Sequence, residues 1–150
     1  MKKFKILLVD DEEEFVKSLS ERLQLRDMSS DIAFNGEAAL ELVTNETPDV
    51  MVLDLRMPGI DGLEVLKRVK QKYPEVQVII LTGHGTEKDE AVARKLGAFA
   101  YLRKPVNLDE LIAKLKKAFK ATVEKSMVAA AFAEQGEMDT AREIIKEEKD

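Results

Sequence analysis

Short apolar runs alternate along most of the chain with segments whose apolar residues recur every three or four positions. The runs typical of buried strands are Ile6 to Val9, Ile32 to Phe34, Val50 to Leu53, Val76 to Leu81 and Ala98 to Leu102. The segments between them have the spacing of helices, as in Phe15, Leu19 and Leu23. Helices that separate strands in this way predict a parallel sheet, because each parallel connection has to cross over the sheet. The pattern therefore predicts an α/β domain with five strands and with helices on both faces.

A fifth helix is predicted to begin near Leu108, and no helix breaker follows before Gly136. This helix outlasts the predicted sheet. A further helical stretch, about Met138 to Glu148, completes a predicted helical hairpin. We therefore predict a sheet domain at residues 1–120 and a C-terminal helical extension at residues 121–150. Folding back onto the sheet domain, dimerisation and docking to a partner are the alternatives for that extension.

The composition excludes several kinds of chemistry. The 150 residues carry a net charge of −5, which argues against a surface for nucleic acid, and the absence of cysteine excludes disulfides and thiolate catalysis. A metal ion would therefore bind through oxygen ligands. The apolar run at Ile6 to Val9 is too short for a signal peptide. We expect a cytoplasmic protein that does not enter a membrane.

Polar residues that carry chemistry follow the predicted strands. Asp10 and Asp11 come after the first strand, Asp54 after the third, Thr82 after the fourth and Lys104 after the fifth. The carboxyl ends of parallel strands meet at one edge of the sheet, where ligands bind. Taken singly, each residue could serve a local structural role such as capping a helix. Together, three carboxylates at one edge repel one another unless a cation lies among them, and Mg²⁺ is the ion that an open site with oxygen ligands favours.

This set of side chains suits phosphoryl transfer. A carboxylate can attack phosphorus and form an aspartyl phosphate. In-line transfer places negative charge on the equatorial oxygens, and a metal ion, a hydroxyl donor and a lysine ammonium together neutralise that charge. The strand ends supply the carboxylate, the hydroxyl and the lysine.

Four segments of the chain resemble the receiver domains of two-component response regulators. The segments are Ile6 to Glu12, Asp54 to Gly62, Leu81 to His84 and Tyr101 to Pro105. The resemblance covers about Lys3 to Phe119. It implies a receiver domain at residues 1–120, with a flavodoxin-like, doubly wound parallel sheet of five strands in the order 2-1-3-4-5.

The resemblance implies roles for residues around the first and third strands. Asp54 is implied to be the phosphoacceptor. Mg²⁺ is the implied cofactor, with Asp11, Asp54 and the backbone carbonyl of Arg56 as ligands and with Asp10 acting through water. In this family the positions of Arg56 and His84 flank the phosphoryl group and influence how fast water reaches it.

The resemblance also implies roles for residues on the fourth and fifth strands. Thr82 and Lys104 would bind the phosphoryl oxygens and, with Asp54, form the catalytic set. Thr82 and Tyr101 would form the switch, in which the aromatic ring turns inward when the hydroxyl moves toward the phosphoryl group. The Lys104–Pro105 bond is similar to the family's cis peptide.

The function implied is a signalling switch, not an enzyme that acts on external substrates. A sensor histidine kinase or a phosphotransfer protein would supply the phosphoryl group, and phosphorylation would change contacts with a downstream protein. The surface of the fourth helix, fifth strand and fifth helix, together with the C-terminal helices, is the expected docking surface, and a homodimer is a further option. Residues 121–150 carry four Lys or Arg against eight Asp or Glu, so we expect no direct contact with nucleic acid.

Two other functions stay open on the sequence alone. One is a scaffold that keeps the receiver fold and signals without phosphate, although the complete set of acidic, hydroxyl and lysine residues disfavours it. The other is a Mg²⁺-dependent phosphohydrolase of the haloacid dehalogenase type, which also combines an Asp nucleophile with Thr and Lys. That family has an Asp-x-Asp pattern and usually a cap domain, whereas this chain has adjacent Asp10 and Asp11.

Overall fold

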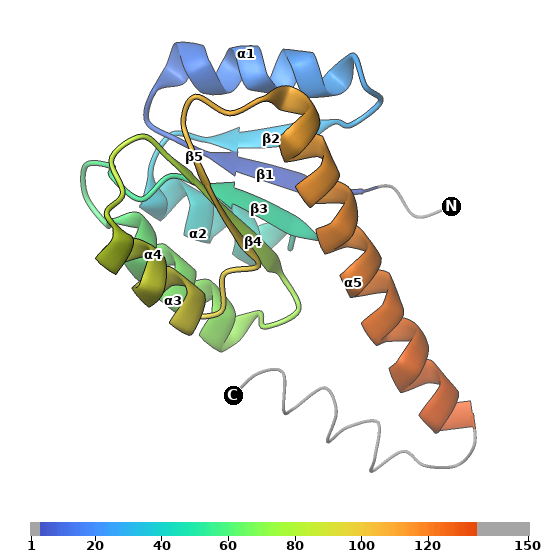
Figure 1. Cartoon of the computed structure of the whole chain (residues 1–150). Helices are drawn as coiled ribbons and strands as arrows, with labels where there is room; N and C mark the ends of the chain where they lie inside the picture. Colours follow the sequence, from blue (N-terminus) through green and yellow to red (C-terminus); the bar gives the residue numbers. More distant parts are fainter. Residues whose placement is uncertain (1–3, 135–150) are drawn as a thin grey trace.

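Five strands alternate with five helices in the computed structural model, which describes the backbone of residues 4–134 and the side chains as far as residue 124 (Figure 1). The strands are β1 (Ile6–Val9), β2 (Ser30–Ala33), β3 (Val50–Leu53), β4 (Gln77–Thr82) and β5 (Ala100–Arg103). The helices are α1 (Glu13–Gln24), α2 (Gly36–Asn45), α3 (Gly62–Lys72), α4 (Glu87–Lys95) and α5 (Leu108–Glu134). This alternation confirms the α/β class that the hydrophobic pattern predicts.

The strands form one parallel sheet in the order β2-β1-β3-β4-β5. The chain passes from β1 outward to β2 and then returns to the other side of β1, so the strand order reverses between β1 and β3. A crevice forms outside the carboxyl ends of the strands at such a reversal, because the connections there leave toward opposite faces of the sheet. The topology confirms the predicted flavodoxin-like order and marks the ends of β1 and β3 as the place for a site.

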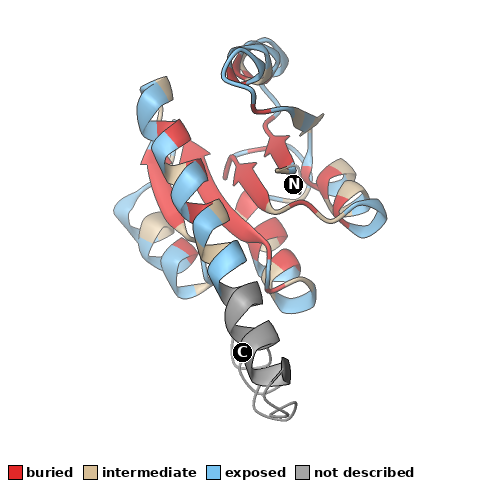
Figure 2. Cartoon of the chain, turned by 90° about the vertical axis from the view of Figure 1, so that its right-hand side faces the viewer, coloured by how far each residue is buried: buried red, intermediate tan, exposed pale blue. Residues whose placement is uncertain are grey.

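The sheet separates two apolar cores, because successive side chains of a strand face opposite sides. Helices α1 and α5 cover one face and pack on strand residues such as Leu8 and Ile79. Helices α2, α3 and α4 cover the other face and pack on residues such as Val9 and Met51. Figure 2 shows the buried strands between helices whose outer surfaces are exposed. Burial on both faces explains why β1 and β3 are continuously apolar in the sequence.

Three strands begin at other positions than the apolar runs predict. Strand β2 starts at Ser30, two residues before the predicted Ile32, while β4 and β5 start at Gln77 and Ala100. The apolar runs mark burial, whereas the ladder of backbone contacts bounds a strand, and Ser30 already pairs with Ile6 in that ladder. The number and order of the strands are unaffected.

Side-chain caps fix where three helices begin. Asn35 accepts a hydrogen bond from a backbone N–H of the first turn of α2 at 2.8 Å, and Asp61 does the same for α3 at 3.0 Å. Thr86 and Asp89 form a capping box at the start of α4, in which each side chain accepts from the other's backbone N–H. These bonds satisfy N–H groups that the start of a helix leaves unpaired. The three helices therefore start on the edge of the sheet where the strands end.

Helix α5 continues past the sheet (Figure 1). It spans 27 residues and passes position 120 without interruption, so the predicted boundary between residues 1–120 and 121–150 falls inside a helix. The second helix of the predicted hairpin, about Met138 to Glu148, lies outside the described residues. Within residues 4–134, no helix is long and apolar enough to span a membrane.

Candidate functional site

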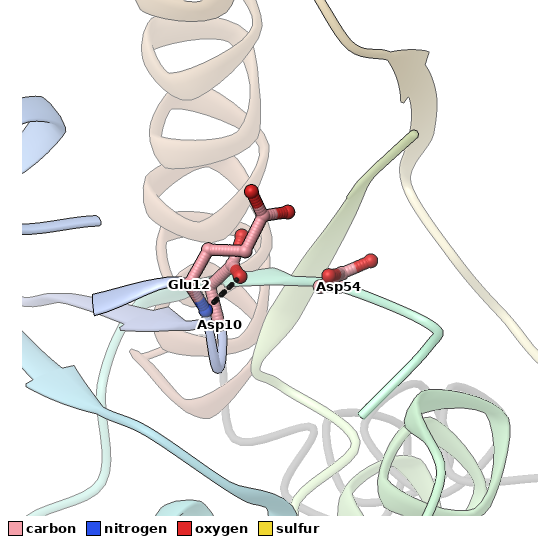
Figure 3. A group of neighbouring side chains, drawn as sticks. All are labelled: Asp10, Glu12 and Asp54. Atoms are coloured by element: carbon pink, nitrogen blue, oxygen red, sulfur yellow. Dashed lines mark hydrogen bonds between the residues drawn. The ribbon is translucent and has the colours of Figure 1, made fainter. Parts of the chain in front are cut away.

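Three carboxylates gather where β1 and β3 end. Asp10, Glu12 and Asp54 each have an oxygen atom within 4.8 Å of the others (Figure 3). Asp10 and Asp54 follow neighbouring strands, so the parallel pairing of β1 and β3 brings them together. Both are buried, while Glu12 is exposed. The backbone N–H of Glu12 donates to Asp10 Oδ1 at 2.9 Å, which fixes the turn that follows β1.

The ammonium group of Lys104 lies among these carboxylates. Its Nζ donates to Asp10 Oδ2 at 2.7 Å and to Glu12 Oε1 at 2.9 Å. It lies 3.7 Å from Asp54 Oδ2 and 4.3 Å from the centre of the Phe15 ring, whose negative face attracts the cation. The Lys104 side chain is 12% exposed, so water competes little for these contacts.

These contacts shift the pKa values of the charged groups. Burial alone would lower the pKa of Lys104, but the hydrogen bonds to Asp10 and Glu12, together with the negative charges of Asp10 and Asp54, outweigh it, and the pKa is raised. The hydrogen bond from Lys104 lowers the pKa of Glu12. Burial raises the pKa of Asp10 by more than Lys104 lowers it. One ammonium group lies among three carboxylates, and a divalent cation would neutralise the charge that it leaves.

Thr82 stands at the end of β4, on the same edge of the sheet. It is fully buried, and its hydroxyl oxygen accepts a hydrogen bond from the His84 N–H at 3.3 Å. The hydroxyl hydrogen is thus available for a further acceptor. The Lys104–Pro105 peptide bond, which follows β5, is cis, as the resemblance implies.

Asp11 and Glu12 follow Asp10 in the turn after β1, and both are exposed. Asp11 is exposed and lies outside the group of clustered carboxylates, so its role as a metal ligand stays a prediction. Glu12 occupies the cap position of α1, but its side chain makes no capping bond and instead accepts from Lys104. The run of acidic residues after β1 was the only signal for this contact.

A family model described as the response regulator receiver domain matches residues 6–116. The chain belongs to this family. The match spans all five strands of the receiver and the site residues from Asp10 to Lys104. It favours neither the phosphohydrolase nor the phosphate-independent scaffold, and a receiver domain is not a classical enzyme.

Curated relatives of this receiver are response regulators. An NtrX-like response regulator of Rickettsia typhi is 36% identical over 124 residues, which make up 81% of this chain and 26% of the relative. The DNA-binding transcriptional regulator NtrC of Escherichia coli K12 is 48% identical over 85 residues, which make up 56% of this chain and 18% of the relative. The chain therefore spans no more than 26% of the length of either relative.

Solved structures agree with the receiver fold. A response regulator receiver domain protein from Methanospirillum hungatei superposes with a TM-score of 0.80 at 26% identity, covering 83% of this chain and 99% of that one. NtrX from Brucella abortus superposes with a TM-score of 0.81 at 27% identity, covering 90% of this chain and 30% of that one.

In the receiver, Arg56 lies between Asp54 and α4. Its backbone N–H donates to Asp54 Oδ1 at 3.4 Å, and its Nη2 donates to Asp89 Oδ2 at 2.8 Å. The backbone hydrogen bond from Thr86, helped by the charge of Arg56, holds the pKa of Asp89 below its usual value. The loop after β3 is thereby tied to the first turn of α4. The metal-binding role of the Arg56 carbonyl stays a prediction.

Tyr101 of the receiver lies inward. Its side chain is buried on β5, and within the described residues its hydroxyl has no hydrogen-bond partner. Burial raises the pKa of that hydroxyl. A Cβ atom added at Gly85 would overlap the Tyr101 hydroxyl, so the ring occupies space that only a glycine leaves free. Arg103 donates to the Gly85 carbonyl at 2.7 Å and holds the loop over the ring. The switch role of Tyr101 stays a prediction.

Proposed function

We propose that Asp54 of this receiver accepts a phosphoryl group, and that the phosphorylated domain signals through changed protein contacts. The observation that carries this proposal is the Lys104 ammonium, which lies 3.7 Å from the buried Asp54 carboxylate at the crevice between β1 and β3. A carboxylate with a fixed ammonium beside it can attack phosphorus while the ammonium neutralises the phosphoryl oxygens. Low exposure of Asp54 strengthens this attraction, because little water screens it.

The proposed reaction is an in-line transfer. An Asp54 oxygen forms a bond to phosphorus while the bond from phosphorus to the donor's histidine nitrogen breaks, and the electron pair leaves with that nitrogen. Lys104 binds one phosphoryl oxygen, and the Thr82 hydroxyl donates its hydrogen to another. Hydrogen bonds to Asp10 and Glu12 hold Lys104 near Asp54 before the reaction, so this group needs little reorganisation as charge develops.

The donor atoms of the cluster fit Mg²⁺. Carboxylate oxygens from Asp10 and Asp54 lie within 4.8 Å of each other, and such hard oxygen ligands are the ones Mg²⁺ prefers. Asp11 and the carbonyl of Arg56 are the further ligands that we propose. When bound, Mg²⁺ supplies charge that neutralises the phosphoryl oxygens. Asp10, whose pKa burial raises, would be held in its charged form by the ion.

The proposed partners follow from the receiver chemistry. A sensor histidine kinase or a phosphotransfer protein donates the phosphoryl group, and donor and receiver then share one compartment, which we take to be the cytoplasm. Movement of the Thr82 hydroxyl toward the phosphoryl group would change the packing around Tyr101. The surface of α4, β5 and α5 would carry that change to a downstream protein or to a second copy of the chain.

Intact mass after incubation with acetyl phosphate and Mg²⁺ tests the proposal. We expect the native chain to gain one phosphoryl group, and Asp54→Ala to gain none under the same conditions. Asp31→Ala is the matched control, because it removes an exposed carboxylate of β2 away from the site. The control is expected to gain the group as the native chain does.

Three results would contradict the proposal. The first is no mass gain in the native chain with any donor, and the second is an equal gain in Asp54→Ala. The third is a gain that is unchanged after Mg²⁺ is removed with a chelator, which would reject the role of the metal ion.

A further inference from the structure

Helix α4 is held to the sheet by few apolar contacts. It buries only Ala93, whereas α3 buries Gly62, Val65, Leu66 and Val69. Elements with few buried contacts open locally at low free energy. Polar contacts at the start of α4 therefore decide how firmly this helix is held.

Two arginines hold the first turn of α4 and the loop before it. Arg56 reaches it from the loop after β3 and donates to Asp89 Oδ2 at 2.8 Å. Arg103 reaches it from β5, donates to the Gly85 carbonyl at 2.7 Å and lies 3.8 Å from a Glu90 carboxylate oxygen. Of these two, Arg56 is also in contact with the candidate phosphoacceptor through its backbone. Its ion pair thus links the site to α4.

We propose that Arg56 has two alternative anionic partners, Asp89 before phosphorylation and the phosphoryl group on Asp54 afterwards. Asp89 is then a positioning residue, which holds the guanidinium group away from the site. Phosphorylation removes one of the contacts that hold α4. We rest this inference on the proposed phosphorylation of Asp54.

Asp89 is the more firmly held partner of the pair, and Arg56 is the more exposed one. The Asp89 side chain is 17% exposed, whereas that of Arg56 is 54% exposed. The same Asp89 oxygen also accepts from the Thr86 N–H at 3.1 Å, and the Asp89 N–H donates to Thr86 Oγ1 at 3.1 Å. When Arg56 leaves, the capping box remains, so Asp89 keeps a hydrogen bond and α4 keeps its start.

A phosphoryl group is the stronger partner for the guanidinium. It carries more charge than a carboxylate and offers several oxygens to the planar fork of arginine. The Arg56 backbone N–H lies 3.4 Å from Asp54 Oδ1, so the new group forms next to the base of this side chain. Breaking the old ion pair opposes the exchange. The cost of breaking this ion pair lowers the affinity of Arg56 for the phosphoryl group by about two- to fivefold, the range of an exposed ion pair.

Binding of beryllium trifluoride, which mimics a phosphoryl group on an aspartate, measures this opposition. A fluorine NMR titration in Mg²⁺ gives the affinity for the native chain and its variants. We expect Asp89→Asn to bind the mimic about two- to fivefold more tightly than the native chain, because Arg56 no longer has to leave a charged partner. We expect Arg56→Ala to bind it more weakly, and Asp89→Asn to have no effect on top of Arg56→Ala.

Two control variants separate the ion pair from other effects. Glu87→Gln removes a negative charge from the same turn of α4, and Thr86→Ala weakens the helix cap but keeps the Arg56 contact. Both should bind the mimic with the affinity of the native chain. Equal tightening in Glu87→Gln and Asp89→Asn, or tightening by Asp89→Asn without Arg56, would overturn the proposal in favour of a general effect of charge.

Hydrogen exchange of the α4 amides gives a second readout. In the native chain, exchange in α4 should speed up when the mimic binds, because the Arg56 contact is lost. In Arg56→Ala, exchange should be fast from the start and should not change on binding. No change in the native chain would overturn the release of α4. A native chain that binds no mimic and takes up no phosphoryl group would instead reject the proposed function.

Discussion

Replacing Gly85 with alanine tests how tightly the loop before α4 closes over Tyr101. A Cβ atom at Gly85 would overlap the Tyr101 hydroxyl oxygen, and it would lie 2.8 Å from Thr82 Cγ2 and 3.0 Å from Tyr101 Cζ. The backbone of Gly85 is outside the left-handed region, so alanine adds crowding without backbone strain. Something in this contact must therefore move.

The magnitudes favour a shift of the loop over a turn of the ring, because turning the ring has a net cost of about 1–5 kcal/mol and shifting the loop costs about 1–3 kcal/mol. Turning the ring outward exposes an aromatic side chain of about 150–250 Å², which costs about 4–6 kcal/mol at 25 cal/mol per Å². Relief of the unpaired Tyr101 hydroxyl returns about 1–3 kcal/mol of this. Overpacking that is relieved by a small shift of the loop backbone costs about 1–3 kcal/mol. Helix α4, which follows the loop and buries only Ala93, can shift with it. We expect Gly85→Ala to lower the free energy of unfolding by about 1–3 kcal/mol.

Urea denaturation followed by circular dichroism measures this free energy. Tyr101→Phe removes the overlapping oxygen, and we expect it to stabilise the native chain by about 1 kcal/mol, because the hydroxyl is buried and has no partner among the side chains that the structure describes. On that background, Gly85→Ala should cost less than in the native chain, with the contact of 2.8 Å to Thr82 Cγ2 still to be relieved. Gly83→Ala is the matched control, with Lys104 atoms no closer than 3.7 Å to the new Cβ, and it should change stability by less than about 0.5 kcal/mol.

The double-mutant comparison decides whether this reasoning holds. A cost of Gly85→Ala that is the same with tyrosine and with phenylalanine at position 101 would show that the hydroxyl is not the obstacle. A Tyr101→Phe variant clearly less stable than the native chain would show that the hydroxyl has a partner in solution.

Four further predictions concern the site and its supports. Gly62→Ala should cost about 3 kcal/mol in urea unfolding, since its Cβ would overlap the carbonyl oxygen of Asp54 and lie 2.6 Å from Leu55 Cα, both backbone atoms. Asn35→Ala should cost about 1 kcal/mol in the same assay, because it removes the cap of α2. Mg²⁺ at a hundredfold excess over its Kd should stabilise the native chain by about 2.7 kcal/mol in thermal unfolding, and Asp54→Ala should lose most of this gain. The pKa of Asp89 is lowered in the folded chain. Its carboxylate therefore contributes stability above the unfolded-state pKa of about 3.9, and this contribution is lost as the pH falls through the folded-state pKa. The difference in stability between the native chain and Asp89→Asn should shrink in acid and persist at neutral pH.

The sheet could be predicted from the sequence because its strands are buried on both faces. Such strands leave continuous apolar runs, and the polar residue after each run falls on the ligand-binding edge. This is why Asp10, Asp54, Thr82 and Lys104 could all be placed at the carboxyl edge before the fold was known. Strand ends were less certain, because burial and backbone pairing stop at different residues, as at Ser30.

The contacts between loops could not be predicted in this way. Arg56 and Asp89 are 33 residues apart, and no periodic pattern relates a loop after β3 to the first turn of α4. Glu12 and Lys104 are 92 residues apart, and the direction of Glu12 depends on a turn at the end of β1. The Tyr101 hydroxyl has no hydrogen-bond partner in the described part of the chain and lies against Gly85, and no sequence pattern records this contact.

Helix α5 extends well beyond the sheet, so a tilt at its packed end is amplified at its far end. Its 27 residues form a rod of about 40 Å at a rise of 1.5 Å per residue. Leu111, Leu115 and Ala118 anchor one end on the sheet. The helix continues for 13 residues from Thr122 to Glu134, roughly 20 Å, so a tilt of about 10° at the anchor displaces its far end by about 3 Å. A small change of angle at the anchor thus becomes, at the end of α5, a displacement close to the length of a hydrogen bond.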